Sequence, residues 1–486
     1  MYNQGISQKA KTFILSFMIY GLASAFARFF GFILTPIYTR VLSPEDYGAI
    51  ELITVSTYFL SIFCATEIWA GVSRDYTESR QNPKLLRELV STGLYYIILL
   101  SAIVIAVVTL FLDHIMDMII LDHKYRSSFY AGVLTIPFSV AFSYFNVLLR
   151  FENRPWPFFF GIVSQLVITA AISICLIVVY HTGTWGYFIG QLSGCIAGMA
   201  VFLYLLRGYL VPRFSLSILK KILRFSLPIV PAVIAVWLNS YANRFVMLKD
   251  MSLHDIGIYA VALKVSSIFM FLEYALRLAW TPFMYELISE PDYLERIKRI
   301  YGILLKLLTI LFLTIGVFSR ELIAILAPAE YQQAGGIAAL LCIPAVLIIL
   351  NLILSAGPLI ARKTQYESVC QILGLIFNLT TLLFTVRYWG LVGAALSYVG
   401  GTLITSVLYY YYSHKLIKLA IPTAMTLIAA GTMTFAVLMA GQPDITLLSK
   451  FVFLILIVIP SSFLLLYKDR EVRSVIFRIH EKYLNR

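Results

Sequence analysis

The sequence has little charge and few cysteines for its length. Charged residues make up 13% of the 486 residues, whereas 60% are hydrophobic, which is more apolar material than one water-soluble core can bury. The five cysteines lie in apolar stretches without paired spacing, which argues against a disulfide framework and a metal site. A phosphate-binding glycine-rich loop and a large polar domain are also missing. The sequence therefore predicts neither an enzyme nor a cofactor.

Long apolar segments fill most of the chain instead. A membrane-spanning helix needs about 20 mostly apolar residues, and charged or Pro/Gly-rich breaks divide the chain into fourteen such segments. They are 12–38, 47–72, 89–112, 127–149, 157–180, 185–206, 225–248, 255–281, 297–319, 334–360, 367–386, 390–412, 419–440 and 448–467. The first segment lacks a cleavage site and is expected to remain as a span. The predicted fold is an all-α integral membrane protein with about 14 transmembrane helices.

The basic residues alternate strongly between the two sides of these spans. One set of connectors and the termini carry 26 Lys and Arg residues, and the other set carries 7. Because cytosolic loops hold the excess of Lys and Arg, both termini are expected in the cytosol of a bacterial inner membrane. The net charge of +13 then reflects orientation and contact with anionic headgroups rather than nucleic-acid binding.

A short motif occurs twice, at a constant offset of 209 residues. The segment from Arg40 to Gly48 contains Ser43, Asp46 and Gly48, and the segment from Lys249 to Gly257 repeats these residue types in register. Each copy follows one apolar span and opens the next, which favours an internal duplication. The predicted organisation is an N-terminal six-helix lobe (1–206), a cytosolic connector (207–224), a C-terminal six-helix lobe (225–412), two additional transmembrane helices (413–467) and a cytosolic amphipathic tail (468–486).

Arg28 is the clearest candidate for function inside a span. Burying an ionisable group in a membrane costs about 2.5 to 3.5 kcal/mol on insertion scales, so such groups tend to face a cavity or a partner. One small and polar stripe along the first span consists of Gly21, Ser24, Arg28, Gly31 and Thr35. Two interpretations stay open: Arg28 lines a cavity, or it pairs with Glu67 and joins two helices.

Other ionisable groups lie in later spans. Glu273 and Arg277 have the i,i+4 spacing of a local ion pair, Lys264 precedes them on the same span, and Lys306 lies in the middle of the ninth. Arg244 lies near a helix end, where a long side chain can reach the interface. We expect Lys264, Arg277 and Lys306 to be candidates for binding an anionic substrate, and Glu67 and Glu273 for helix pairing or ion coupling.

A second polar stripe, on the eleventh predicted span, consists of Glu367, Gln371, Gly374 and Asn378. Such stripes line cavities or hydrogen-bond to neighbouring helices, and both interpretations stay open.

Three stretches give the chain its resemblance to a known family. They are Arg28 to Gly48; Phe225 to Pro231 with Asn243-Arg244-Phe245 and Gly257-Ile258-Tyr259; and Ala279 to Phe283. On these residues the chain resembles the Wzx-type polysaccharide flippases, in the superfamily that includes MATE exporters and MurJ-type lipid II flippases. The resemblance implies two pseudo-symmetric lobes around a cationic central cavity that holds the pyrophosphate of a lipid-linked oligosaccharide. Arg28 fits that role best by position.

The resemblance also implies which partners to expect. They are the lipid-linked oligosaccharide, membrane lipids and the polymerase and assembly proteins of a surface polysaccharide, with the flippase itself acting as a monomer. Two alternatives stay open. An ion-coupled MATE-like exporter of small molecules would want carboxylates in its cavity, but basic residues outnumber acidic ones within the spans. A membrane glycosyltransferase or polymerase would usually have a large outward loop, and the outward loops here are short.

The fourteen-span arrangement makes a prediction about topology. A reporter fused after Asp444, between the last two predicted spans, should lie outside the cytosol, and one fused after Arg486 should lie inside, because an even number of spans separates the termini. Alkaline phosphatase and fluorescent-protein fusions measure the two locations. The opposite result at either position would contradict the fourteen-span arrangement.

Overall fold

The computed structural model describes residues 2–79, 81–119, 122–442 and 449–450. These residues are predominantly helical, and none of them lies in a β-strand. Since hydrocarbon offers no partner for a free peptide group, helices that satisfy their own N–H and C=O groups are the expected solution. The chain divides into two compact units, Met1–Ala260 and Val261–Arg486, which are described separately. The prediction of an all-α membrane protein is confirmed.

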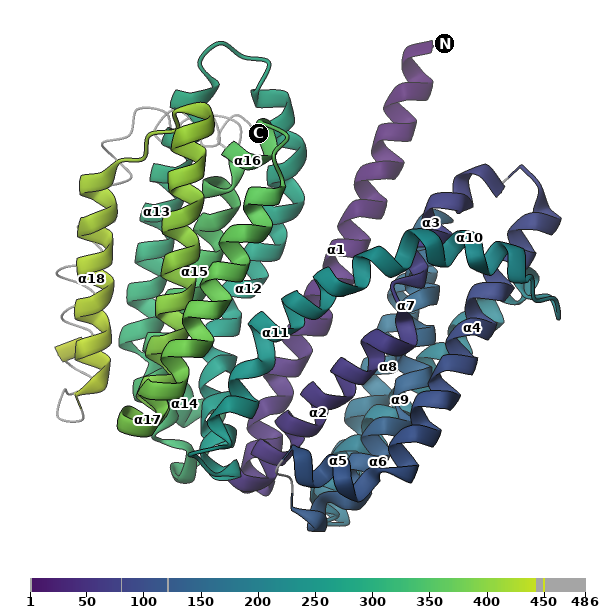
Figure 1. Ribbon diagram of the computed structural model, residues 1–486, viewed down its shortest axis with the longest axis horizontal. Helices are drawn as coiled ribbons and strands as arrows, with labels where there is room; N and C mark the ends of the chain where they lie inside the picture. Colours follow the sequence, from purple (N-terminus) through teal and green to yellow (C-terminus); the bar gives the residue numbers. More distant parts are fainter. Residues whose placement is uncertain (1, 80, 120–121, 443–448, 451–486) are drawn as a thin grey trace, which may run out of the picture. The chain divides into compact units, whose positions relative to one another are not determined.

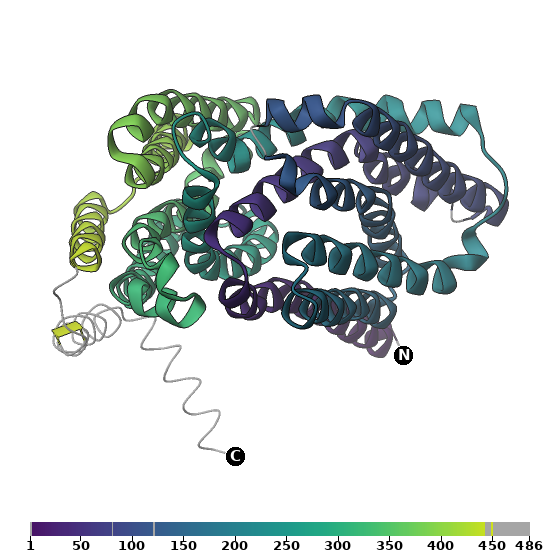
Figure 2. The same ribbon diagram turned by 90° about the horizontal axis from the view of Figure 1, so that it is seen from below.

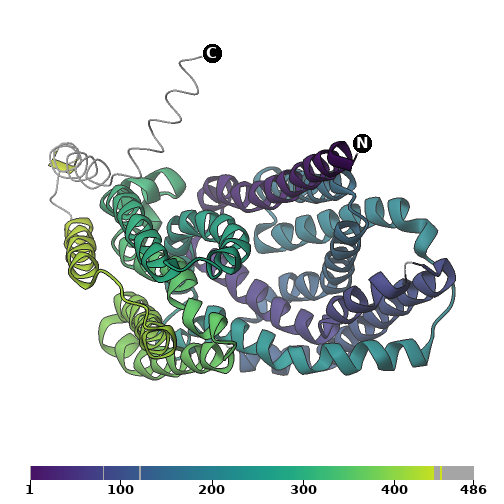
Figure 3. The ribbon, with the colours of Figure 1, turned by 90° about the horizontal axis from the view of Figure 1, so that it is seen from above.

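Unit 1 contains the helices up to the beginning of α12 (Figure 1). They are α1 (Tyr2–Val41), α2 (Pro44–Ala65), α3 (Ile68–Ser79), α4 (Pro83–Leu110), α5 (Leu112–Met118), α6 (Arg126–Leu134), α7 (Ile136–Phe151), α8 (Pro155–Ile174), α9 (Gly183–Leu206), α10 (Leu216–Ser226), α11 (Val230–Met247) and α12 (Leu253–Leu287), with short 3₁₀ or π segments η1 (His123–Tyr125), η2 (Cys175–Val179), η3 (Arg207–Tyr209) and η4 (Leu227–Ile229). Helix α1 packs along α8, beside the blue and teal helices in the views from below and above (Figure 2, Figure 3).

Unit 2 is built around α15. It contains the remainder of α12, then α13 (Tyr293–Val317), α14 (Ser319–Leu326), η5 (Ala329–Tyr331), α15 (Ala334–Leu354), α16 (Ala356–Ile360), α17 (Gln365–Ile417) and α18 (Thr423–Gly441). Helix α15 contacts α13, α14, α17 and α18, and most of its side chains are buried. Helix α18, in yellow, lies at the edge of this bundle (Figure 3).

Within the described residues, eleven helical stretches are long and apolar enough to cross a membrane. The sequence predicted fourteen spans, and three differences explain the gap. The stretch Gln365–Ile417 counts once, although its helical geometry is interrupted at Gly390 (φ 52°, ψ −130°), the first residue of the second of two predicted spans. The first helix counts only as a shorter apolar stretch, Phe29–Val41. The predicted span 448–467 and the tail 468–486 lie outside the described residues, apart from 449–450.

The predicted connector 207–224 contains an amphipathic helix. Helix α10 packs against α3 and α4, and its Ile222 is buried whereas Lys220 and Lys221 are exposed. The Lys221 ammonium lies 3.0 Å from a carboxylate oxygen of Asp75 on α3. The apolar face of this helix is therefore held by protein within unit 1, and the lobe boundaries around it remain a prediction.

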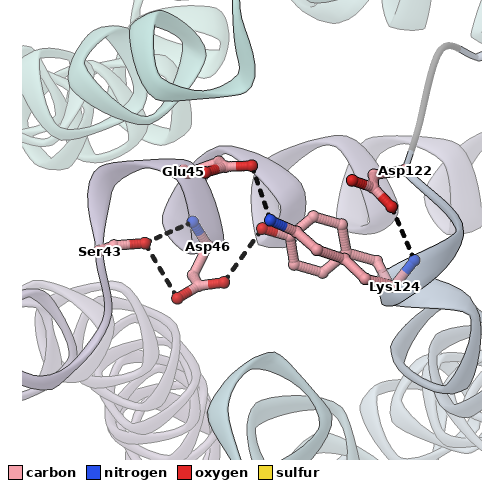
Figure 4. A network of polar contacts seen from close by, with 6 residues as sticks. Ser43, Glu45, Asp46, Asp122 and Lys124 are labelled. Atoms are coloured by element: carbon pink, nitrogen blue, oxygen red, sulfur yellow. Dashed lines mark hydrogen bonds and ion pairs between the residues drawn. The ribbon is translucent and has the colours of Figure 1, made fainter.

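Polar groups fix the beginning of α2 (Figure 4). Ser43 accepts a hydrogen bond from the backbone N–H of Asp46 and donates one to the Asp46 carboxylate, so it satisfies a peptide group that has no partner in the helix. The Lys124 ammonium lies 2.8 Å from the Glu45 carboxylate, and the Tyr125 hydroxyl donates to Asp46. The network ties the beginning of α2 to the segment before α6.

The repeated motif is a repeated structure. Ser252 and Asp255 cap the beginning of α12 with the same pair of bonds that Ser43 and Asp46 make at α2. The two helix beginnings also touch each other within unit 1. A methyl group on Gly48 would lie 1.9 Å from the carbonyl oxygen of Leu253, and one on Gly257 would lie 1.9 Å from that of Pro44.

This contact is symmetric, because Pro44 and Leu253 are related by the same offset of 209 residues as Gly48 and Gly257. A similar close approach occurs in two helix hairpins. A methyl group on Gly194 of α9 would lie 2.6 Å from a backbone oxygen of α8, that of Gln165. One on Gly401 would lie 2.7 Å from the backbone oxygen of Gly374. Gln165 and Gly374 are 209 residues apart, whereas Gly194 and Gly401 are 207 apart. Glycine thus lets backbones approach in a hairpin of each half of the sequence.

The close approach at Gly48 makes a prediction about stability. Gly48→Ala and Gly257→Ala should each destabilise the protein by about 1 to 3 kcal/mol, because the new methyl group meets a backbone carbonyl that cannot move alone. The midpoint of thermal unfolding of the purified protein in detergent measures this.

Gly431→Ala in α18 is the matched control, since no atom of the residues that the structure describes lies within 4 Å of the added methyl group. It should leave the midpoint unchanged or raise it, because alanine favours the helix. Equal midpoints for Gly48→Ala and Gly431→Ala would contradict the close-contact explanation.

Candidate functional site

Arg28 lies in α1, the helix in which the sequence placed it. Its side chain lies outside the described part of the structure. The choice between a cavity position and a pair with Glu67 therefore stays a prediction. Glu67 lies outside helices α2 and α3, in the break between them, where Thr66 and Glu67 have φ values of 43° and 54°. The sequence had placed both residues inside one continuous span, 47–72, and this boundary was wrong.

The Arg244 side chain is buried, with 6% of its surface exposed. The expectation that it reaches the membrane interface is therefore wrong. Its guanidinium makes an ion pair with Glu51 of α2, in which Nε and Nη2 lie 3.2 and 3.1 Å from Oε1. Nη1 donates to the backbone oxygen of Ser240 at 2.6 Å. The rings of Tyr241 and Tyr259 lie 5.4 and 5.7 Å from the guanidinium carbon, within cation–π range.

This pair closes a contact between α2 and α11 within unit 1. Next to it, the Trp237 indole N–H donates to the backbone oxygen of Val55 at 3.3 Å, and both residues belong to a buried cluster with Ile62. Taking two charges out of water is costly, and only good geometry with further hydrogen bonds offsets that cost. A buried pair with this many partners is a structural connection between the two helices rather than a free binding group.

A sequence signal for this pair existed. Glu51 follows Ser43 by eight residues, and Arg244 precedes Ser252 by eight residues. Each charge therefore lies about two helical turns from the matching copy of the motif. The sequence thus placed opposite charges at equal depth in two predicted spans. It did not show that these two spans are neighbours.

In unit 2, the predicted ion pair of Glu273 and Arg277 is present on α12. Arg277 Nη2 lies 2.5 Å from Glu273 Oε1. The two ends of this pair have different surroundings, because 7% of the Glu273 side chain is exposed and 58% of the Arg277 side chain. The guanidinium end of this pair is therefore more exposed than the carboxylate end, and an exposed guanidinium suits phosphate or carboxylate oxygens.

The polar stripe of α17 lies close to Arg277. The charge of Arg277 acts on the Glu367 carboxylate and on the Tyr409 hydroxyl. The Gln371 amide donates to the same hydroxyl at 3.0 Å, and Asn378 is buried. The stripe thus has two parts. Gln371 and Asn378 face neighbouring helical segments, whereas Glu367 lies within electrostatic range of Arg277.

The two candidate lysines are half-buried in different helices of unit 2. Lys264 lies on α12 and makes no ion pair with any side chain that the structure describes, although its backbone oxygen accepts from Ser267. Lys306 lies on α13. Of the six predicted site residues, the structure thus brings Glu273 and Arg277 into contact, and their roles stay predictions. In the part of the chain that is described, no group of three or more His, Cys, Asp and Glu side chains could hold a metal ion.

Comparison with known proteins supplies the family and the fold. Residues 14–288 match the family described as polysaccharide biosynthesis protein. No curated protein matches the chain by sequence.

The fold is similar to that of several solved transporters. An inward-facing MATE-family multidrug resistance transporter of the MOP superfamily has a TM-score of 0.68 at 14% identity, over 83% of this chain and 96% of that one. The lipid II flippase MurJ, in an inward closed conformation, has a TM-score of 0.67 at 14% identity, over 96% of this chain and all of that one. An outward-facing MATE transporter has a TM-score of 0.54 at 15% identity, over 84% of this chain and 95% of that one.

The buried ion pair makes a prediction about stability. Glu51→Gln should destabilise the protein by about 3 to 5 kcal/mol, because it leaves the buried Arg244 charge without its partner. Arg244→Gln should cost less, because the Glu51 side chain keeps 20% of its surface exposed. The double variant should lose less than the sum of the two. Thermal unfolding of the four proteins measures the coupling.

The exposed pair of Glu295 and Lys298, 3.4 Å apart, is the control. Removing its charges should not shift the unfolding midpoint measurably, since exposed pairs contribute little. Strictly additive effects for Glu51 and Arg244 would show that the two groups do not act as a pair.

Proposed function

Because the chain belongs to the polysaccharide biosynthesis protein family, we propose that it is a flippase for a polyprenyl-pyrophosphate-linked oligosaccharide. In this proposal it carries one repeat unit of a surface polysaccharide across the bacterial inner membrane by alternating access. The single observation that carries the proposal is the family match over residues 14–288, from α1 to the end of α12. The fold shared with MATE transporters and with a lipid II flippase supports a transporter.

The charges within the spans support an anionic substrate. Two of the basic residues in these segments are opposed by carboxylates, Arg244 by Glu51 and Arg277 by Glu273. Arg277 nevertheless keeps more than half of its side chain exposed, and Lys264 has no ion-pair partner among the described residues. We propose that Arg28, Lys264, Arg277 and Lys306 contact the pyrophosphate, arginine as a planar fork and lysine as a point charge.

The same charges argue against the alternatives. An exporter of cationic compounds needs uncompensated carboxylates in its path, but Glu51 and Glu273 are held by arginines. For Glu67 and Glu273 we propose helix pairing or ion coupling. A glycosyltransferase or polymerase would need a separate catalytic constellation, and a sugar-transfer assay with the purified protein distinguishes that function from transport.

We further propose the surroundings in which transport takes place. Both termini lie in the cytosol, two six-helix lobes (1–206 and 225–412) flank the substrate path, and the protein functions as a monomer. Its partners are the lipid-linked oligosaccharide, membrane lipids, and the polymerase and assembly proteins of the polysaccharide. The repeated contacts at Gly48 and Gly257 support a duplicated architecture of this kind.

The substrate role of Arg28 makes the first functional prediction. Arg28→Ala should insert normally but slow transport by one to two orders of magnitude, because a charge-assisted contact contributes about 1.5 to 3 kcal/mol. Arg28→Lys should recover part of the activity, since it keeps the charge and loses the fork. Accumulation of lipid-linked oligosaccharide in the inner leaflet, at equal protein levels, measures the effect.

Arg387→Ala is the matched control, because Arg387 is exposed and lies outside the predicted spans. It should transport normally. Normal transport by Arg28→Ala would overturn the substrate role. Loss of the protein from the membrane in both Arg28→Ala and Glu67→Gln would instead support the pairing of Arg28 with Glu67.

A further inference from the structure

An apolar groove runs between α8 and α9 in unit 1. Its larger part has a volume of about 620 Å³ and is lined by Trp156, Phe160, Val201, Tyr204 and Leu205, among others. Both helices belong to the same hairpin, whose glycines keep them in close contact beside the groove. The walls of the groove are apolar.

The groove continues along α8. A second part, of about 430 Å³, shares Phe160 and Val201 with the first and extends to Val167 and Ile168. From Trp156 to Ile168 the helix rises about 18 Å, at 1.5 Å per residue. One leaflet of the hydrocarbon core is about 15 Å thick, half of the full 30 Å. The groove therefore has the length of one lipid chain within one leaflet.

Two arginines lie at one end of this groove, each attached to a residue of its wall. Arg154, just before α8, donates from Nη1 to the backbone oxygen of Leu205 at 3.3 Å. The Arg207 guanidinium stacks on the Tyr204 ring, 4.7 Å from its centroid. Arg207 is exposed and Arg154 is half-buried. The donors that remain on both side chains are available to an anion at the end of the groove.

The neighbouring carboxylate does not cancel this charge. Glu152 accepts a hydrogen bond from the Tyr209 hydroxyl at 2.7 Å and makes no ion pair with Arg154 or Arg207 in the described structure. The exposed Trp156 and Tyr204 side chains lie at the same end as the arginines, and such aromatic residues are typical of the interface between headgroups and chains. Along the groove, the apolar walls, the aromatic side chains and the two arginines thus come in the same order as the acyl chain, the interfacial region and the phosphate of a phospholipid.

We propose that α8 and α9 bind one anionic phospholipid, with its phosphate on Arg154 and Arg207 and one acyl chain along the groove. The basic asymmetry of the sequence predicts that these arginines lie at the cytosolic surface, so the proposed lipid belongs to the inner leaflet. The proposal does not depend on the transported substrate. It assigns a lipid site to a hairpin for which the predicted transport route gives no role.

Native mass spectrometry of the purified full-length protein tests the proposal. Phosphatidylglycerol and phosphatidylcholine with identical chains are added separately, and retained adducts are counted. The wild type should retain phosphatidylglycerol preferentially. Arg207→Ala should weaken its apparent affinity for phosphatidylglycerol about tenfold, because one charge-assisted contact is lost. Equal retention of both lipids by the wild type would overturn the proposal.

Matched variants make the result specific. Lys220→Ala removes an exposed cation from α10, away from the groove, and should leave phosphatidylglycerol retention unchanged. Ala200→Phe fills the groove without changing charge and should reduce retention of both lipids. An equal loss in Lys220→Ala and Arg207→Ala would show that general surface charge, and not this site, holds the lipid.

Competition distinguishes the phospholipid from a polyprenyl lipid. Polyprenyl phosphate added at equal concentration should not displace phosphatidylglycerol. If it does so in the wild type but not in Ala200→Phe, the groove serves a polyprenyl chain and the phospholipid assignment is wrong. Arg207→Ala is preferred to a variant of Arg154, since the Arg154 bond to Leu205 also connects the two helices. Its unfolding midpoint, measured first, should equal that of the wild type.

Discussion

Hydrocarbon supplies no hydrogen-bond partner, and the rest of this structure depends on that constraint. Every peptide group within a span must be satisfied by its own helix, so the described chain is helical and its beginnings are capped by side chains such as Ser43 and Ser252. Lipid also provides little hydrophobic driving force for helix association, so close packing at small residues stabilises the contacts between helices instead. Gly48 and Gly257 are the clearest example, because each packs against a backbone carbonyl of the other helix at a distance that leaves no room for a methyl group.

The features that depend on local sequence could be predicted. Apolar length located the helices, and the repeat at an offset of 209 residues located two equivalent helix beginnings. The interruptions were harder, since they come from backbone geometry that many residues can adopt. Thr66 and Glu67 take left-handed conformations inside a predicted span, and nothing in their chemistry requires it. Gly390 interrupts α17 at a place where the sequence did show a break, because glycine adopts such a conformation without strain.

The candidate site depends on which helices are neighbours, and a single sequence does not contain that information. Arg244 and Arg277 look alike in the sequence, as basic residues within spans. Arg244 is enclosed by Glu51 and two tyrosines, whereas Arg277 pairs with Glu273 and keeps 58% of its side chain exposed. Spacing predicted the Glu273 pair because i,i+4 residues always meet on a helix. The Glu51 pair joins residues 193 positions apart, and only packing brings them together.

Helix α12 carries both the glycine contact and three of the charged candidate residues. It begins with the glycine contact of unit 1 and continues into unit 2, where it carries Lys264, Glu273 and Arg277. From Gly257 to Arg277 the helix rises about 30 Å, which is the thickness of the hydrocarbon core. The helix has no internal proline before Pro282, so a sharp bend has no proline to cause it between these positions. Between these positions Ser266 and Ser267 donate to the backbone oxygens of Leu263 and Lys264, and a serine pair of this kind is where a helix without proline can bend.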